Sequence, residues 1–223
     1  MNGLMRTRVA ALRERLEDAA RRAGRDLSNV KIIGVSKGAS TRLMLEMRDA
    51  GICDFGENRA QELLGKAASG CFGHDVTWHF LGRLQSNKVR VLAPHVTLWH
   101  SIDRRELADE LARHAPGAAV LVQVNVGGDP LKAGCSESAA PDLVHELSSR
   151  GLRVEGLMTI PPAGMDPRPF FAALADLGGR LGLRELSMGM TDDFEVAMEE
   201  GATMVRVGRG LFGPRTSEPD QFG

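Results

Sequence analysis

Aromatic side chains and excess charge are both scarce in this sequence. It contains no tyrosine and two tryptophans, Trp78 and Trp99, and its formal net charge is −1. Proteins that hold single-stranded nucleic acid stack the bases on aromatic side chains along a basic groove. Attraction to nucleic acid or to an anionic membrane surface also needs a positive field, which a near-neutral chain does not supply. We therefore expect no nucleic-acid partner and no membrane partner.

Cysteines and long apolar runs are equally sparse. Cys53, Cys71 and Cys135 are widely and irregularly spaced, which fits neither a disulfide framework nor a zinc site. The histidines likewise form no ligand spacing, so no metal is expected. No stretch approaches the roughly 20 apolar residues of a transmembrane helix, and residues 1–25 lack the apolar core of a signal peptide. The expected location is the cytoplasm.

Short apolar segments alternate with helix-like segments along the chain. Segments of this kind, bounded by turn residues, predict buried strands, and there are eight of them, at 30–35, 52–55, 77–81, 97–102, 119–126, 154–160, 184–188 and 204–207. Such alternation predicts parallel strands joined by right-handed crossovers. We predict one α/β domain over residues 1–223, a single (β/α)8 TIM-type barrel with a flexible tail after about residue 214. A doubly wound open sheet is the competing architecture.

Local signals mark several helix ends. Asp103 and Asp192 are each followed three residues later by Glu, a pattern that predicts a capped helix start. Proline at 167 and 169 fits another helix start. Glycines that directly follow predicted helices indicate left-handed stop positions, at Gly51, Gly151 and Gly201.

A lysine stands where such barrels carry their chemistry. Active sites of these barrels lie at the carboxyl ends of the strands, and Lys37 follows the first predicted strand directly. Desolvation above an apolar core disfavours the charged ammonium, and the neutral amine is the nucleophile that forms Schiff bases. A strand-end lysine more commonly extends into solvent, so Lys37 is weak evidence by itself.

Two glycine-bearing loops follow predicted strands seven and eight. The first contains Ser187 and Gly189, and the second runs from Arg206 through Gly208 and Arg209. Barrels of this kind commonly bind phosphate at these two loops, where glycine lets the backbone approach the anion and Ser187 could add a hydroxyl donor. Plain tight turns are the alternative. Residues 208–213 also match the dinucleotide pattern G-x-G-x-x-G, which we reject because only ten residues follow it.

Six longer motifs resemble one known family. They occur in the family's order from the first helix to Gly213, and they read Val35-Ser36-Lys37, FGENRAQE at 55–62, WHFLGRLQSNK at 78–88, GLMTIP at 156–161, LSMGM at 186–190 and VRVG at 205–208. The chain thereby resembles the pyridoxal 5'-phosphate (PLP) homeostasis protein family. It departs from that pattern at Gly38, where many members have threonine, and at Arg59, where others have tyrosine, which affects the expected pocket rim.

The resemblance implies a fold, a cofactor and a site. The barrel would be like the N-terminal domain of bacterial alanine racemase, and PLP would form an aldimine with Lys37. Phosphate contacts are implied for Ser187, Gly208 and Arg209, with Gly189 in the same pair of loops, and Arg206 would face the pyridine nitrogen. Residues implied to line the ring are Asn58, His79 and Met158.

Whether such a protein turns over a substrate is a separate question. Racemisation by a two-base route needs a second acid–base group opposite the lysine; alanine racemase uses a tyrosine from a second domain, and this chain has no tyrosine. We therefore predict a monomeric carrier that sequesters PLP and other B6 vitamers, with delivery to PLP-dependent apoenzymes as an extension of that role. Lys132 is either a second PLP contact or transfer site, or a surface loop lysine.

Two enzyme hypotheses remain open beside the carrier. The first is a PLP-dependent enzyme acting on amino acids, in which His79 or a substrate group serves as the second base. The second is a metabolic barrel enzyme that binds a phosphorylated sugar and uses Lys37 for an aldolase-type Schiff base.

Overall fold

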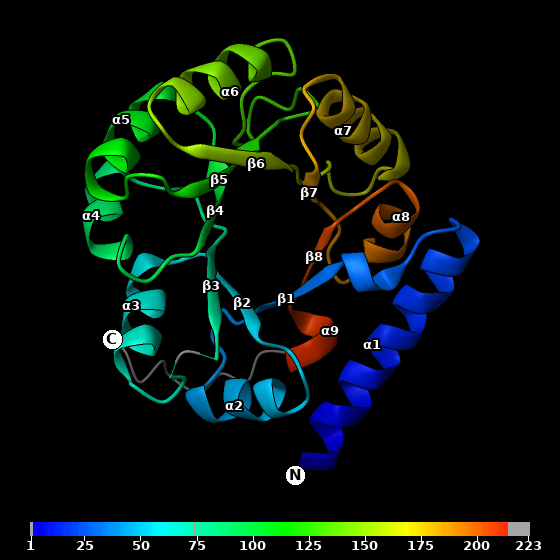
Figure 1. Cartoon of the computed structure of the whole chain (residues 1–223). Helices are drawn as coiled ribbons and strands as arrows, with labels where there is room; N and C mark the ends of the chain where they lie inside the picture. Colours follow the sequence, from blue (N-terminus) through cyan, green and yellow to red (C-terminus); the bar gives the residue numbers. More distant parts are fainter. Residues whose placement is uncertain (1, 74, 214–223) are drawn as a thin grey trace.

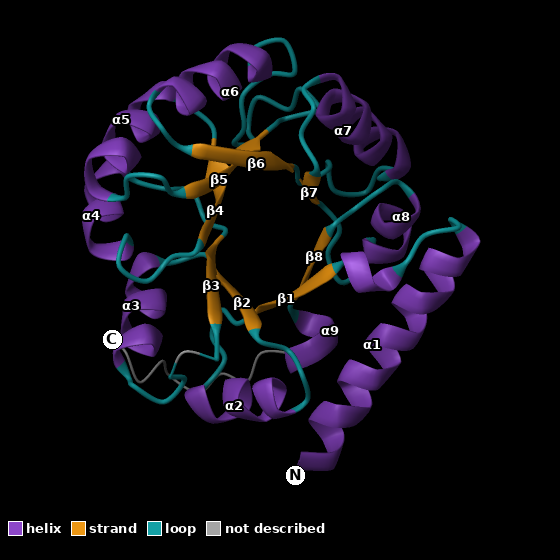
Figure 2. Cartoon of the chain, viewed as in Figure 1, coloured by secondary structure: helices purple, strands orange, loops and turns teal. Residues whose placement is uncertain are grey.

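Eight parallel strands close into a ring in the computed structural model, which describes residues 2–73 and 75–213. Figure 1 and Figure 2 look into this ring, with the helices outside it. The strands are β1 (Lys31–Val35), β2 (Asp54–Glu57), β3 (Thr77–Phe80), β4 (Leu98–Ile102), β5 (Ala119–Gln123), β6 (Arg153–Met158), β7 (Glu185–Ser187) and β8 (Met204–Val207). β8 pairs with β1, so the predicted (β/α)8 barrel is confirmed and the open sheet is wrong.

Helices form the outer layer. They are α1 (Asn2–Arg22), α2 (Thr41–Asp49), α3 (Ala60–Ala68), α4 (Val89–Leu92), α5 (Arg105–His114), α6 (Ala140–Ser149), α7 (Arg168–Arg180), α8 (Phe194–Glu199) and α9 (Arg209–Phe212), with short 3-10 turns η1 (Leu27–Asn29) and η2 (Ser86–Lys88). The long first helix lies outside the ring against α2, α8 and α9 (Figure 1). No helix in the described part of the chain is both long enough and apolar enough to cross a membrane.

Strands β4, β5 and β8 are buried along their whole length, as parallel strands covered by helices must be, while β1 and β6 are exposed at their first residue. Apolar side chains between strands and helices form the main core, and a second, smaller apolar cluster comprises Ile33, Leu98, Ala119, Leu121, Met158 and Met204. Polar side chains are buried in the barrel as well, among them His79, His100, Ser187 and Arg206. The interior is therefore a packed core of mixed polarity.

Helix ends follow the sequence signals only in part. The three predicted glycine stops have positive φ, at +92°, +77° and +105° for Gly51, Gly151 and Gly201, and α7 begins at the prolines as predicted. The two predicted acidic caps are wrong. The N-caps are Arg104 and Asp193 instead, and neither makes a side-chain capping hydrogen bond, because the chain enters each helix one residue later than the pattern implies.

Strand ends shift where the chain bends back. β5 ends at Gln123, short of the predicted residue 126, because the following segment pairs locally with Cys135. Asn125 accordingly donates its backbone N–H to the Cys135 carbonyl at 2.9 Å. β2 begins at Asp54, two residues later than predicted, and extends to Glu57. The tail after residue 214, predicted to be flexible, lies outside the described residues.

Candidate functional site

A cavity of about 260 Å³ opens where the carboxyl ends of β1, β2 and β8 meet the loop after β7. Five of the predicted site residues line this cavity: Lys37, Asn58, Arg206, Gly208 and Arg209. They come from both ends of the chain, residues 37–58 and 206–209, so closure of the ring through the β1–β8 pair brings them together. This is the end of the barrel at which such folds carry chemistry.

The backbone on either side of Lys37 is fixed by a buried ionic cluster. The Lys66 ammonium donates to the Ser36 carbonyl at 2.7 Å and to Glu57 Oε1 at 2.6 Å, while the Ser36 hydroxyl donates to the same Glu57 oxygen at 2.6 Å. On the other side, the Gly38 N–H donates to Glu62 Oε2 at 2.9 Å. Because its neighbours are tied down, Lys37 leaves the strand end in one defined place.

Burial sets the electrostatics of that cluster. Lys66 is 2% exposed and the Glu57 side chain is fully buried. Burial raises the pKa of Glu57, and the ammonium of Lys66 opposes part of the rise. Glu62 and Lys66 lie four residues apart on α3, so they share one helix face. Glu57 Oε2 has no hydrogen-bond partner among the described residues. The ion pair of Glu57 Oε1 with Lys66 is therefore the main interaction that offsets the cost of burying this carboxylate.

The loops after β7 and β8 meet at the far side of the cavity. Gly210 donates its N–H to the hydroxyl of Thr191 at 3.4 Å. A Cβ at Gly210 would stand 3.0 Å from Val207 Cγ1 and 3.3 Å from Thr191 Cγ2, so glycine permits this approach. Thr191 and Asp192 line the cavity. The sequence analysis missed Thr191, although it stands two residues after Gly189 in the same loop.

Arg206 closes the inner wall. Its guanidinium is buried and donates to the Ser187 hydroxyl at 2.7 Å and to the Thr159 carbonyl at 2.8 Å. Burial lowers its pKa to about 10, while the carboxylate of Asp193 acts in the opposite direction. Arg206 is therefore a cation at neutral pH with both terminal nitrogens held in place.

Four predicted ligand contacts fall outside this cavity. The Ser187 hydroxyl is inside the barrel, bonded to Arg206 and His100, and Met158 packs in the smaller apolar cluster. His79 hydrogen-bonds to His100 and Asp54. Gly189 has φ +87°, and a Cβ there would overlap Ala197 and Phe194 of α8. In this arrangement these side chains and positions belong to the barrel interior and to the packing of the loop, and their contacts with PLP stay predictions.

Arg209 and Lys132, two further residues singled out in the sequence, each have a polar partner. Arg209 forms an ion pair with Asp192 at 2.7 Å, and both side chains are more than two-thirds exposed. Pairs of that kind contribute little to stability, so the guanidinium can exchange its partner for another anion. Lys132, on the loop after β5, donates to the Pro161 carbonyl and does not line the cavity beside Lys37.

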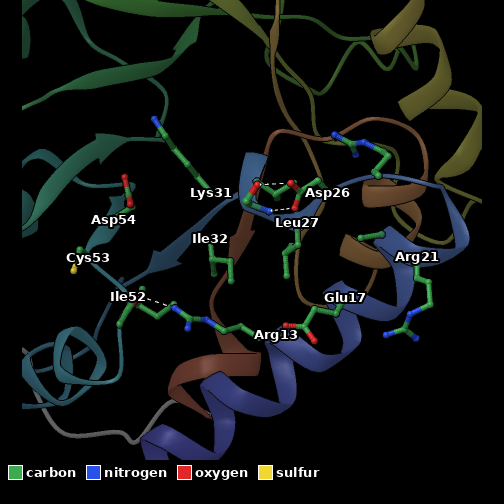
Figure 3. A pocket seen from close by; sticks show the side chains of 15 residues that line it. Arg13, Glu17, Arg21, Asp26, Leu27, Lys31, Ile32, Ile52, Cys53 and Asp54 are labelled. Carbon is green, nitrogen blue, oxygen red and sulfur yellow. Dashed lines mark hydrogen bonds between the residues drawn. The ribbon is translucent and has the colours of Figure 1, made fainter.

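A larger cavity of about 760 Å³ lies at the opposite end of the barrel (Figure 3). It is bounded by α1, η1 and the starts of β1 and β2, where Lys31 and Asp54 stand. Arg13 and Arg25 on its wall are occupied with backbone carbonyls, at Gly51 for the first and at Met198 and Ala202 for the second. Size alone does not make it the reaction site, since the amino ends of barrel strands serve stability.

Comparison with known proteins identifies relatives of this chain. Residues 8–216 match the family model described as alanine racemase, N-terminal domain. The pyridoxal phosphate homeostasis protein of Aquifex aeolicus is 42% identical over 222 residues, covering 93% of this chain and 97% of that protein. The Pseudomonas aeruginosa protein of the same name is 41% identical over 217 residues, covering 93% and 94%.

Solved structures give the same result. PipY of Synechococcus elongatus, solved with PLP bound, is 33% identical with a TM-score of 0.79, and the match covers 94% of this chain and all of PipY. An alanine racemase from Clostridium difficile shares the fold alone, at 15% identity and a TM-score of 0.71 over 94% of this chain and 58% of that one.

Fold and site thus define a (β/α)8 barrel of the alanine racemase N-terminal type, with a lysine at the mouth of its cavity. The sequence relatives narrow this class to one family. The chain belongs to the pyridoxal phosphate homeostasis protein family.

Proposed function

We propose that this chain binds PLP covalently through Lys37 and acts in intracellular PLP homeostasis as a carrier. The proposal rests mainly on Lys37, which lines the cavity. Among the described residues, its ammonium makes no hydrogen bond and no ion pair. Relatives covering nearly the whole chain bear the name of this function, and PipY has been solved with PLP bound.

The lining residues fit the three parts of PLP. The Lys37 amine would add to the aldehyde carbon, and a C=N bond would form as one water leaves. The phosphate would meet the backbone of Gly208 and Gly210, the hydroxyl of Thr191 and the guanidinium of Arg209, a donor set suited to an anion. The buried Arg206 would face the pyridine nitrogen.

The same residues favour storage over turnover. Bound PLP supplies an electron sink, which is strongest when its pyridine nitrogen is protonated. A cationic Arg206 beside that nitrogen disfavours the proton. The titratable side chains lining the cavity are Lys37, Asp192, Arg206 and Arg209, and Asp192 already pairs with Arg209. His79, considered as a second base, is committed to Asp54 and His100.

The first experiment measures absorbance of purified wild type, Lys37→Ala and Lys132→Ala after incubation with PLP. We expect a yellow band in the wild type and in Lys132→Ala, and none in Lys37→Ala. Borohydride should then fix the label on the peptide that contains Lys37. A wild type that takes up no PLP contradicts the proposal, as does label fixed on another lysine.

A second experiment separates a carrier from an enzyme. PLP-loaded protein is mixed with a PLP-dependent enzyme stripped of its cofactor, and in parallel with free amino acids. We expect the stripped enzyme to recover activity while no amino acid is consumed or racemised. Catalytic turnover of an amino acid would overturn the carrier role and leave PLP binding intact.

A further inference from the structure

A continuous line of hydrogen bonds crosses the barrel interior behind the cofactor cavity. Arg206 donates to the Ser187 hydroxyl at 2.7 Å. Ser187 Oγ lies 2.9 Å from His100 Nδ1, and His100 Nε2 lies 2.9 Å from His79 Nδ1. His79 Nε2 lies 2.9 Å from Asp54 Oδ1. These five residues come from five strands, so the closed barrel assembles the line.

With both imidazoles neutral, the chemistry of the groups fixes the direction of every bond. Arginine can only donate, so Ser187 Oγ accepts from it and turns its own proton toward His100 Nδ1. A neutral imidazole that accepts at Nδ1 carries its proton on Nε2, and His100 therefore donates to His79. By the same step His79 donates from Nε2 to the Asp54 carboxylate. The line then runs from a cation to an anion with every donor matched.

The reverse order fails at the carboxylate. If His100 donated to Ser187, a neutral His79 would donate to His100 and turn the lone pair on its Nε2 toward the Asp54 oxygen. The surroundings also favour a neutral His100. Burial lowers the pKa of His100 well below 6.5, and the positive charges of Arg206 and Lys31 act in the same direction.

We infer that Asp54, His79, His100 and Ser187 are positioning residues that hold Arg206 in its orientation toward the pyridine nitrogen, with both imidazoles protonated at Nε2. The inference rests on the proposed function, since Arg206 acts on bound PLP. It adds to that function a fixed polar line that ties the cofactor cavity to the opposite end of the barrel.

Asp54 is the accessible end of this line. Its side chain is 27% exposed and lines the larger cavity, where Figure 3 shows it beside Lys31 at the starts of adjacent strands. His79 and His100 are buried, at 1% and 0% exposed. A change at Asp54 therefore alters the far end of the line without entering the cavity that holds Lys37.

Nitrogen NMR of the histidines tests the direction of the bonds. Protein labelled with ¹⁵N in histidine, purified and stripped of PLP, is measured near pH 8 with long-range ¹H–¹⁵N correlations. We expect the Nε2–H tautomer for both His79 and His100, assigned through His79→Gln and His100→Gln. An Nδ1–H tautomer in either residue would overturn the inference. This measurement needs no cofactor, so it determines the direction of the hydrogen bonds even if the protein binds no PLP.

PLP retention tests the effect on Arg206. Asp54→Ala removes the terminal acceptor, Asp54→Asn keeps an oxygen acceptor without the charge, and Glu17→Ala removes another acid from the same cavity wall. We expect Asp54→Ala to raise the PLP dissociation constant about fivefold, the worth of one net hydrogen bond. The dissociation constant of Asp54→Asn should lie between those of Asp54→Ala and wild type, and that of Glu17→Ala should equal the wild-type value. The absorption maximum of bound PLP should shift in Asp54→Ala.

Thermal stability and PLP binding are measured separately in these variants. If Asp54→Ala lowers the midpoint of thermal unfolding but leaves both the dissociation constant and the absorption maximum at wild-type values, the line only fills the barrel and the inference is wrong. If the wild type itself takes up no PLP, the proposed function fails instead.

Discussion

The ammonium of Lys66 lies 2.7 Å from the carbonyl oxygen of Ser36, the residue before Lys37. This contact joins α3, in the outer layer of helices, to the residue that follows β1 in the barrel. Lys66 at the same time neutralises the buried Glu57 at 2.6 Å. One cation therefore both compensates a buried acid and fixes the backbone next to Lys37.

Lys66→Met should be strongly destabilising. It leaves the Glu57 carboxylate buried without its partner, and breaking a buried pair in this way costs about 3–5 kcal/mol. Chemical denaturation of the variant measures the free energy of unfolding. Arg21→Met is the matched control, because its pair with Asp18 is exposed and such pairs contribute about 0–1 kcal/mol. Equal losses in the two variants would contradict the prediction.

Replacing both partners should be milder than replacing one. Glu57→Met together with Lys66→Met removes the uncompensated charge, and such double replacements are often nearly neutral. We expect the double variant to unfold at higher denaturant than Lys66→Met alone. PLP uptake should still fall in the double variant, since the Ser36 carbonyl has lost its donor.

His100 makes stability depend on pH. Burial lowers its pKa in the folded protein well below 6.5, so below pH 6.5 the unfolded chain binds a proton that the folded chain does not. Its contribution is fully present above pH 6.5 and is lost as the pH falls toward the lowered value, by at most about 1.4 kcal/mol per pH unit. Free energies of unfolding at pH 7.5, 6.5 and 5.5 measure this slope.

The slope should belong to the buried imidazole. In His100→Gln we expect a shallower decline between pH 6.5 and 5.5 than in wild type. His145→Gln, which removes an exposed imidazole on α6, should keep the wild-type slope. A wild-type slope in His100→Gln would show that other groups cause the decline.

Gly82→Ala should disturb the cavity rim. A Cβ at this position would overlap the backbone carbonyl of Asn58, a lining residue, and overpacking of this kind costs about 1–3 kcal/mol. We expect lower stability together with weaker PLP uptake. Gly179→Ala, in α7 with nothing within 4 Å of the new Cβ, should be neutral or stabilising by about 0.5–1 kcal/mol. Equal behaviour of the two variants would refute the close approach.

The three cysteines should differ in reactivity. Cys53 and Cys71 are exposed, whereas burial raises the pKa of Cys135 to about 11. At pH 8 only about one Cys135 thiol in a thousand is ionised, and the thiolate is the reactive form. We expect iodoacetamide to label Cys53 and Cys71 first, as read by peptide mass. In urea-unfolded protein the three rates should converge; a fast Cys135 in the native protein would contradict its burial.

Much of the site could be predicted because it lies close to strand ends in the sequence. Lys37 follows β1, Asn58 follows β2, and Gly208 and Arg209 follow β8, so the rule that barrels act at the carboxyl ends of their strands brings all four to the lining of one cavity. The positions of His79, Ser187 and Met158 could not be predicted in this way. They stand within strands or at their last residues, where the direction and depth of the side chain decide the role.

The sequence by itself determined the order of strands and helices, the lysine after β1, the glycines of the last two loops and the absence of tyrosine. These are local properties, set by short apolar segments, turn residues and composition. Tertiary structure alone decided which side chains reach the cavity and which turn into the barrel. In parallel strands both faces are buried, so no alternation in the sequence marks the inner one. The depth of each residue depends on the tilt and stagger of the closed ring, which is why Thr191 lines the cavity and Ser187 instead joins His100 and Arg206 inside.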